Sequence, residues 1–309
     1  MTFSVFIDGA AGTTGLEIRE RLEGRSEFAL ILLDDAQRKS ADARRAALNE
    51  ADFAILCLPD EAAREAVALI DPAGRTRVID ASSAHRVAQG WTYGFPELVG
   101  AQTVAEARLV SNPGCYPTGF LGLMAPLVRA GLLPAEWPYT VNAVSGYSGG
   151  GKALIERFEA ETDLAFRSYG LALGHKHIAE MQQHAGLAHP PVFAPAVIPA
   201  FRGMVVEVPL PLAAVTAPAP EALSDCLAAF YEDSRIVRVV GTPRDEIVLR
   251  AQEQPHDDLT LQVFGSADGS QARLIAVLDN LGKGASGAAV QSLNLMAGLE
   301  ETLGLRLPA

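Results

Sequence analysis

Cysteine is scarce in this chain of 309 residues, and its scarcity excludes several classes of protein. The three cysteines, Cys57, Cys115 and Cys226, form no CxxC pair and cannot all pair with one another. A disulfide scaffold of the secreted kind and a cysteine-rich metal site are therefore both unexpected. This usage is typical of a reducing compartment, and we expect a cytoplasmic protein.

Positive charge is scarce as well. The chain has 25 Lys and Arg against 37 Asp and Glu, which gives a formal net charge of −12. A chain with this net negative charge is not expected to have a basic surface that binds a nucleic acid or an anionic membrane. We expect neither partner, and an anionic substrate must be held by local Arg, Lys and helix N-termini.

Long apolar runs are absent too. The longest ones, such as AILCLP at 54–59, have the length of a strand, whereas crossing a bilayer takes about 20 apolar residues. The N-terminal stretch MTFSVFIDGAAG enters a strand directly, so we expect no signal peptide. What the chain does have is 49% hydrophobic residues and a length typical of two domains.

The first third of the chain alternates between strand and helix patterns. Apolar strand-like runs lie at 3–7, 28–35, 52–59 and 76–82, with helical patterns between them. This order predicts βαβ units and a parallel sheet covered on both faces.

After Cys115 the pattern changes, and the late runs at 259–266 and 272–280 predict an antiparallel pair. We expect two domains. The first is an α/β Rossmann-type domain with a parallel sheet, which comprises residues 1–115 plus 284–309. The second, residues 116–283, is a catalytic and dimerisation domain of α+β class with a mostly antiparallel sheet.

Three glycines follow the first predicted strand and precede a helix in GAAGTTG: Gly9, Gly12 and Gly15. Glycine permits a tight turn and a close approach of the backbone, and the helix N-terminus supplies N–H groups and the positive end of a dipole. Many ordinary turns match such a string, but its place between strand and helix favours a dinucleotide loop, with Thr13 and Thr14 inside it.

The residues after the second strand leave the choice of cofactor open. Asp34 and Asp35 end this strand, where an acid favours NAD. Arg38 and Lys39 follow at once and can hold the 2′-phosphate of NADP. The alternative for this basic pair is a solvated start of a helix.

Cys115 differs from the other two cysteines. Cys57 lies within an apolar run and Cys226 on an amphipathic helix, as expected of small buried hydrophobes. Cys115 lies in SNPGCYPTG, between proline and glycine residues that fix a sharp turn where a helix begins. Because a helix N-terminus stabilises a thiolate, Cys115 is a candidate nucleophile, with a buried thiol as the alternative.

SNPGCYPTG resembles the active-site segment of the N-acetyl-γ-glutamyl-phosphate reductases, arginine-biosynthesis enzymes related to aspartate-semialdehyde dehydrogenases. Further segments are similar to the shorter form of that family, in order along essentially the whole chain: IDGAAGTTG (7–15), DASSAHR (80–86), YGFPE (93–97), SGYSGGGK (145–152), GHKHIAE (174–180), FRGM (201–204) and DNLGKGASGAAVQ (279–291). Ala179 stands where many members have Pro, which we interpret as a change of loop geometry.

The resemblance implies NADP as the cofactor and an active-site role for the pair His175 and His177. A histidine titrates in the range that thioester chemistry requires. We assign the acid/base role to His177 and a supporting role to His175; the reverse order and a merely polar helix start remain alternatives. No carboxylate or cysteine cluster is spaced to complete a metal site, so we expect no metal.

The implied substrate carries a phosphate and a carboxylate, so it needs fixed donors. Arg86 and Arg202 are our candidates, because Arg binds either group bidentately. Ser145 and Gly149 lie in a glycine-rich segment that can form an anion nest. The alternatives are a surface charge or structural ion pair for each Arg and a flexible loop for the glycines.

The resemblance also implies contacts near the nicotinamide from Asn280, Lys283 and Gly284; a strand-to-helix connector without a ligand is the alternative. The expected reaction is the NADPH-dependent reductive dephosphorylation of N-acetyl-L-glutamyl 5-phosphate to N-acetyl-L-glutamate 5-semialdehyde, through a thioester on Cys115, in arginine biosynthesis. The alternatives are an aspartate-semialdehyde dehydrogenase with the same mechanism and an inactive NADP-sensing protein. We expect a homodimer or homotetramer.

Overall fold

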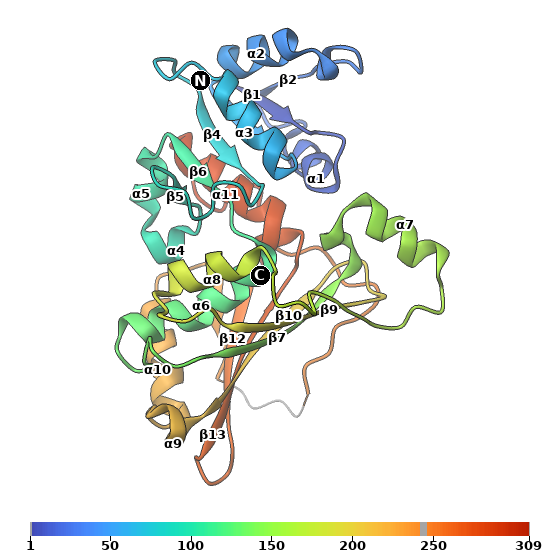
Figure 1. Cartoon of the computed structure of the whole chain (residues 1–309). Coiled ribbons are helices and arrows are strands. Elements are labelled where there is room, and N and C mark those ends of the chain that lie inside the picture. The colour runs from blue at the N-terminus through green and yellow to red at the C-terminus, as the bar shows by residue number, and fades with distance from the viewer. Residues whose placement is uncertain (1, 242–245, 309) are drawn as a thin grey trace. The chain divides into compact units, whose positions relative to one another are not determined.

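The structure is a computed structural model that describes residues 2–241 and 246–308 (Figure 1). It divides into two compact units. The first runs to Pro113 and includes Ala285–Leu305, and the second comprises Gly114–Gly284 and the tail from Arg306. The sequence prediction had placed this tail with the first domain. The backbone N–H of Asp257 donates to the Arg306 carbonyl oxygen at 2.9 Å, and the Arg306 N–H donates to the Asp257 carboxylate at 2.7 Å. These two hydrogen bonds hold the tail against the second unit.

In the described part of the first unit, six strands form one sheet in the order β2-β1-β3-β4-β6-β5, and every neighbouring pair is parallel. The strands are β1 (Phe3–Asp8), β2 (Phe28–Ile31), β3 (Phe53–Leu56), β4 (Arg77–Asp80), β5 (Thr92–Tyr93) and β6 (Leu109–Ser111). The helices are α1 (Thr13–Leu22), α2 (Ala41–Glu50), α3 (Asp60–Leu69), α4 (Pro96–Val99), α5 (Ala101–Glu106) and α11 (Gly287–Met296), with a 3₁₀ turn η1 (Gln37–Lys39). The predicted parallel sheet is confirmed.

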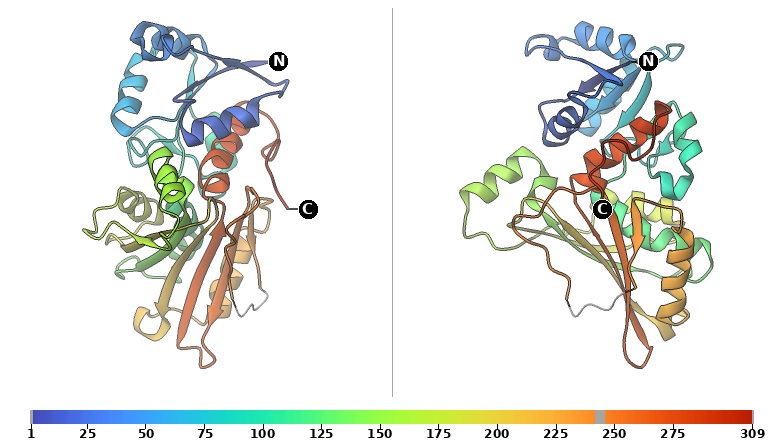
Figure 2. Two further views of the ribbon diagram at one scale, coloured as in Figure 1. Left: turned by 90° about the vertical axis from the view of Figure 1, so that its right-hand side faces the viewer. Right: turned by 180° about the vertical axis from the view of Figure 1, so that it is seen from behind.

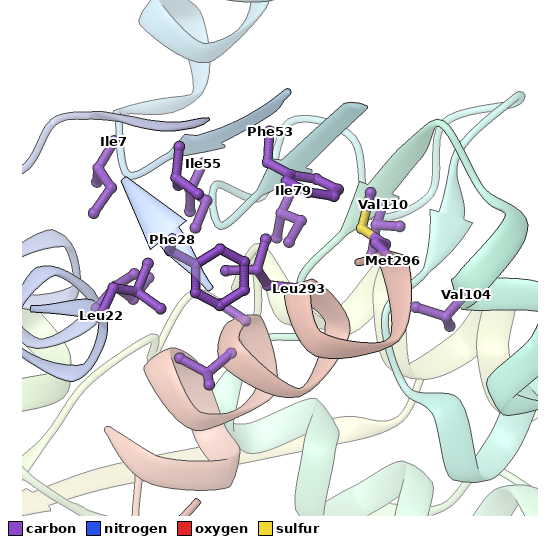
Figure 3. Packing of buried hydrophobic residues seen from close by; sticks show 14 residues of the cluster. Ile7, Leu22, Phe28, Phe53, Ile55, Ile79, Val104, Val110, Leu293 and Met296 are labelled. Carbon is purple, nitrogen blue, oxygen red and sulfur yellow. The ribbon is translucent and has the colours of Figure 1, made fainter. Parts of the chain in front are cut away.

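Both faces of this sheet are buried, which explains why its strands are continuously apolar. On one face, Ile7 packs with side chains of α1 and α11, and Figure 3 shows Leu293 of α11 beside Phe28 and Met296 of α11 beside Val110. On the other face, Phe6 packs with α2 and α3. The period of two along β1 thus separates two clusters, and it directs Asp8, like Phe6, toward α2.

In the described part of the second unit, seven strands form a sheet in the order β11-β12-β13-β10-β7-β9-β8. The strands are β7 (Thr140–Gly146), β8 (Arg167–Ser168), β9 (Val192–Ile198), β10 (Met204–Pro211), β11 (Val237–Val239), β12 (Leu259–Gly265) and β13 (Gln271–Leu278). The pairs β11–β12 and β7–β9 are parallel and the other four are antiparallel. The predicted mostly antiparallel sheet is confirmed, as is the late antiparallel pair.

The helices of the second unit position its polar side chains. They are α6 (Cys115–Arg129), α7 (Lys152–Ala160), α8 (His177–Ala185), α9 (Leu212–Val215) and α10 (Pro220–Phe230), with the 3₁₀ turn η2 (Tyr147–Gly150) and the π-helical turn η3 (Gly282–Ser286) before α11. Figures 1 and 2 show α6, α8 and α10 gathered on one face of the sheet. Almost all of α6 is buried, and it begins at Cys115, where the sequence predicts the start of a helix.

Candidate functional site

The glycine loop after β1 has a shape that only glycine permits at two positions. Gly9 has φ +89°, and a Cβ there would lie 2.2 Å from the Cys57 carbonyl oxygen. A Cβ on Gly15 would lie 2.5 Å from the Gly9 carbonyl oxygen. Gly12 is different, because its φ is −80° and an added Cβ would meet nothing closer than 3.5 Å. The fold itself therefore tolerates a side chain at Gly12.

Thr13 and Thr14 open α1 directly after this loop. The helix has no side-chain cap and no acidic residue in its first turn. Its N-terminal amides and the positive end of its dipole are thus presented to the loop, which is the donor set that a diphosphate requires. The glycine loop after β1 fits a dinucleotide, because a tight turn, a helix N-terminus and small residues occur together there.

The carboxylates of Asp34 and Asp35, which follow β2, both bind groups of their own segment. Asp34 Oδ1 accepts hydrogen bonds from two backbone amides of the following turn at 2.8 and 2.9 Å. Asp35 forms an ion pair with Arg38. Lys39 ends the turn η1 on the exposed surface beside Arg38. Because the Asp34 carboxylate caps its own turn, it is less suited to bind a ribose 2′-hydroxyl. Arg38 and Lys39 lie in the 3₁₀ turn that follows it.

Arg86 is buried in the first unit and binds backbone carbonyl groups. Its Nε donates to the Asn112 oxygen at 2.9 Å, and its Nη2 donates to the Ala81 oxygen at 3.0 Å. These bonds join the segments that follow β4 and β6, so Arg86 has a structural task whatever else it binds.

Cys115 is the first residue of α6, and the turn before it is held by a carboxylate. Gly114 is the N-cap in an extended conformation, and its N–H donates to Glu180 Oε1 at 2.8 Å. Glu180 lies in the first turn of α8 and is 1% exposed. Sequence analysis missed Glu180, although it closes the GHKHIAE segment one helical turn after His177. The start of α6 stabilises negative charge on the Cys115 sulfur.

The two histidines lie together beside Tyr116, the residue that follows Cys115. Their ring centroids are 4.6 Å apart, and those of His175 and His177 lie 6.1 and 5.9 Å from Tyr116. The backbone N–H of His177 donates to His175 Nδ1 at 3.2 Å, so this nitrogen acts as an acceptor and carries no proton. His177 is buried and begins α8. The structure therefore brings the predicted pair to the Cys115 end of α6.

Two further residues near the histidines have no counterpart in the sequence prediction. Tyr169 O–H donates to the Tyr116 oxygen at 3.3 Å, and Tyr116 O–H donates to the Ala196 carbonyl at 3.1 Å. Burial raises the pKa of both tyrosines, with smaller contributions from neighbouring groups that include Cys115, so both remain protonated at neutral pH. The Arg167 guanidinium lies 4.6 Å from the centre of the Tyr169 ring, which places a cation in this aromatic cluster.

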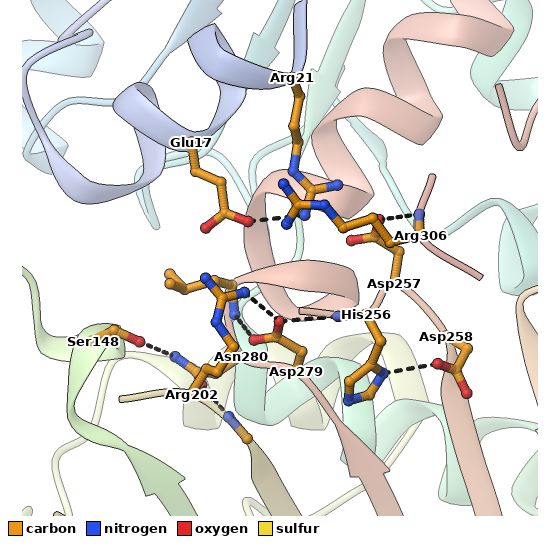
Figure 4. Close-up of polar contacts among 12 residues, drawn as sticks. Glu17, Arg21, Ser148, Arg202, His256, Asp257, Asp258, Asp279, Asn280 and Arg306 are labelled. Atoms are coloured by element: carbon orange, nitrogen blue, oxygen red, sulfur yellow. Dashed lines mark hydrogen bonds and ion pairs between the residues drawn. The ribbon is translucent and has the colours of Figure 1, made fainter. Parts of the chain in front are cut away.

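Arg202 and Asn280 belong to one buried polar network of the second unit (Figure 4). Arg202 Nη1 forms an ion pair at 2.6 Å with Asp279, whose side chain is fully buried. The Asn280 amide nitrogen donates to Ser148 Oγ at 2.9 Å, and its oxygen accepts the Gly203 N–H at 3.0 Å. The charge of Arg202 is thus largely compensated, and the amide of Asn280 is oriented from both ends.

The remaining predicted residues of the second unit are Ser145, Gly149, Lys283 and Gly284. Ser145 is buried and donates to its neighbour's carbonyl oxygen at 3.0 Å. A Cβ on Gly149 would lie 3.3 Å from the Asn280 amide nitrogen. Lys283 is 2% exposed within η3. A Cβ on Gly284 would lie 2.9 Å from Cys115 Cβ, so this glycine lets η3 pass directly beside Cys115.

The other cysteines are chemically inert by comparison. Burial, with the nearby Asp80 and Asp8 carboxylates, raises the pKa of Cys57 to about 12, and partial burial also raises the pKa of Cys226. Within residues 2–241 and 246–308, no three His, Cys, Asp or Glu side chains are grouped to hold a metal ion. No helix in that part of the chain is long and apolar enough to cross a membrane.

Comparison with known proteins agrees with this arrangement of a dinucleotide unit followed by a unit that begins with a cysteine. The family model for the semialdehyde dehydrogenase NAD binding domain matches residues 34–107, and the model for the semialdehyde dehydrogenase dimerisation domain matches residues 115–280. Aspartate semialdehyde dehydrogenase II from Vibrio cholerae has the same fold, with a TM-score of 0.72 at 20% identity over 96% of this chain and 99% of that one.

The class is therefore that of NAD(P)-dependent semialdehyde dehydrogenases, with an NAD(P)-binding unit and a dimerisation unit. An N-acetyl-gamma-glutamyl-phosphate reductase of Burkholderia ambifaria is 52% identical, over 96% of this chain and 96% of the relative. Another, from Nostoc sp., is 49% identical over 97% and 98%. The chain belongs to the N-acetyl-gamma-glutamyl-phosphate reductase family.

Proposed function

We propose that the protein reduces N-acetyl-L-glutamyl 5-phosphate to N-acetyl-L-glutamate 5-semialdehyde with NADPH, as a step of arginine biosynthesis in the cytoplasm. One observation carries the proposal: Cys115 begins α6 with His177, His175 and Gly284 around that end of the helix. Full-length similarity to N-acetyl-gamma-glutamyl-phosphate reductases supports the choice of substrate.

Cys115 is the nucleophile of the proposed reaction. Its thiolate attacks the acyl carbon, a C–S bond forms, the bond from carbon to the phosphate oxygen breaks, and inorganic phosphate leaves. Bound NADPH supplies the hydride that reduces the resulting thioester. The tetrahedral species on Cys115 then loses the C–S bond, which releases the aldehyde and restores the thiolate.

His177 is the acid/base group of the proposal. It takes the thiol proton before the attack, gives a proton to the oxygen of the tetrahedral species, and takes that proton back as the C–S bond breaks and the aldehyde forms. His175 supports it, because His175 Nδ1 already accepts the His177 N–H and its ring packs against aromatic neighbours. Glu180 holds the Gly114 turn and thereby orients the thiol.

The cofactor residues are divided by the part of NADP that they would hold. For the diphosphate they are Gly9, Gly12, Thr13, Thr14 and Gly15; for the 2′-phosphate, Arg38 and Lys39; and near the nicotinamide, Asn280, Lys283 and Gly284. The engagement of Asp34 and Asp35 within their own loop supports NADP over NAD.

The substrate anions are proposed to bind Arg86, Ser145, Gly149 and Arg202. Arg167 is a further candidate for the substrate carboxylate. Its guanidinium lies in the aromatic cluster that contains both histidines, and within the described residues it has no carboxylate at ion-pair distance, whereas Arg202 is paired with Asp279.

We also propose that the protein is a homodimer or homotetramer. The second unit matches a dimerisation domain. Its edge strand β8 is followed by a strongly apolar exposed segment, with Leu171 80% and Leu173 58% exposed, and Phe166 before it is 58% exposed. Exposed apolar groups of this density mark a contact surface.

An oxidative assay tests the proposed reaction. The enzyme is given N-acetyl-L-glutamate 5-semialdehyde, phosphate and NADP, and the absorbance of NADPH is followed. We expect a signal that requires phosphate and disappears after thiol alkylation. Turnover of aspartate semialdehyde instead would keep the mechanism and change the substrate. No turnover of either substrate, with NADPH binding measured, would favour the sensing protein.

Gly12→Ala tests the cofactor loop. The fold accepts a Cβ at this position, so the melting temperature should not change, whereas the methyl group blocks the close approach of the diphosphate. We expect the Kd for NADPH, from fluorescence titration, to rise about tenfold or more. Gly15→Ala is the matched comparison, and its backbone clash should lower both stability and binding. An unchanged Kd in Gly12→Ala would contradict the assignment.

A further inference from the structure

A buried ion pair lies directly under the glycine loop. Asp8 is the last residue of β1 and immediately precedes Gly9. Its Oδ2 accepts hydrogen bonds from Nε and Nη2 of Arg44 at 3.0 and 2.7 Å. The two side chains are only 8% and 16% exposed. Arg44 comes from α2, which covers the face of the sheet toward which Asp8 points.

A carboxylate at this position opposes the proposed ligand. A dinucleotide brings at least two negative charges of its diphosphate to the loop that begins one residue after Asp8, and like charges in a partly buried site repel. The field of Asp8 already reaches its surroundings, since it contributes to the raised pKa of Cys57, whose backbone lies against Gly9. The loop can accept the diphosphate only if this charge is compensated.

We propose that Arg44 is a positioning residue for the dinucleotide: it neutralises Asp8 and holds that carboxylate toward α2, away from the diphosphate, without touching the cofactor itself. This inference rests on the proposed function of the glycine loop. The Asp8–Arg44 pair also ties α2 to the end of β1, so the same contact fixes the base of the loop.

Three variants separate this role from a merely structural one. Arg44→Gln leaves the Asp8 charge uncompensated, Asp8→Asn leaves the Arg44 charge uncompensated, and the double variant removes both charges. Relative to the unaltered chain, we expect the Kd for NADPH to rise about tenfold in Arg44→Gln, to stay equal or fall in Asp8→Asn, and to return to within about twofold in the double variant. A structural role alone would weaken binding in both single variants.

The readout is a fluorescence titration with NADPH at low and at physiological ionic strength, together with a thermal melt of each variant. The tenfold effect should shrink as salt screens the charges. In steady state, the change should appear in the KM for NADPH and not in the KM for the acyl phosphate.

Three results would overturn the inference. They are an unchanged Kd in Arg44→Gln, weaker binding in Asp8→Asn, and a double variant as weak as Arg44→Gln, which would mean that Arg44 contacts the cofactor itself. If Arg44→Gln does not fold, the inference is still tested by the direction in which the Kd for NADPH changes in Asp8→Asn and by the Kd of the double variant. An unaltered chain that does not bind NADPH would instead contradict the proposed function of the loop.

Discussion

Cys115→Ser is expected to abolish the reduction while leaving the cofactor bound. The serine hydroxyl does not ionise near neutral pH, so the attack on the acyl phosphate loses its nucleophile although the shape of the α6 start is retained. We expect kcat/KM to fall by roughly 10⁴-fold or more, as for other enzymes that lose a covalent nucleophile. The Kd for NADPH should stay within about twofold, because the glycine loop is untouched.

The matched control is Cys226→Ser, on the half-exposed face of α10. It should retain full turnover and the sensitivity to alkylation. Both variants are compared by the oxidative assay, by NADPH titration and by thermal melting. Turnover by Cys115→Ser within an order of magnitude of the unaltered enzyme would contradict the covalent route.

His177→Asn is expected to have the second largest effect. Loss of a general acid/base group lowers kcat by about 10²- to 10⁴-fold. Asparagine keeps a polar side chain at the start of α8, so NADPH binding and the melting temperature should change little. The loss should appear in single-turnover reduction, where product release does not limit the rate.

His175→Asn is the control for that experiment. An asparagine oxygen can still accept the His177 N–H, which His175 Nδ1 accepts at 3.2 Å. We expect a loss of less than about tenfold, since only a supporting contact is altered. The reverse order of the two effects would assign the acid/base role to His175, which the sequence left as an alternative.

The elements that could be predicted from the sequence are those with long, regular patterns. The alternation of strands and helices up to residue 82 predicted the parallel sheet, and the runs at 259–266 and 272–280 predicted an antiparallel pair. The two-residue strands β5 and β8 were not predicted, because a pair of residues has no period.

The candidate site was predicted where one segment contains its own signal, as with Cys115 and the two histidines. Contacts between residues of distant segments were not predicted. Glu180 and Gly114 are 66 residues apart, and Arg44 and Asp8 are 36 apart, so no local spacing connects them. For the same reason, the sequence did not show that Asp279 pairs with Arg202.

The central claim is that a thioester forms on Cys115 before any hydride transfer, and intact-protein mass spectrometry tests it most directly. The enzyme is mixed with N-acetyl-L-glutamyl 5-phosphate in the absence of NADPH, and released phosphate is measured in the same sample. The account predicts one equivalent of phosphate and one N-acetylglutamyl group on the peptide that contains Cys115, which NADPH then removes. Phosphate that is retained until NADPH is added, with no adduct on Cys115, would contradict it.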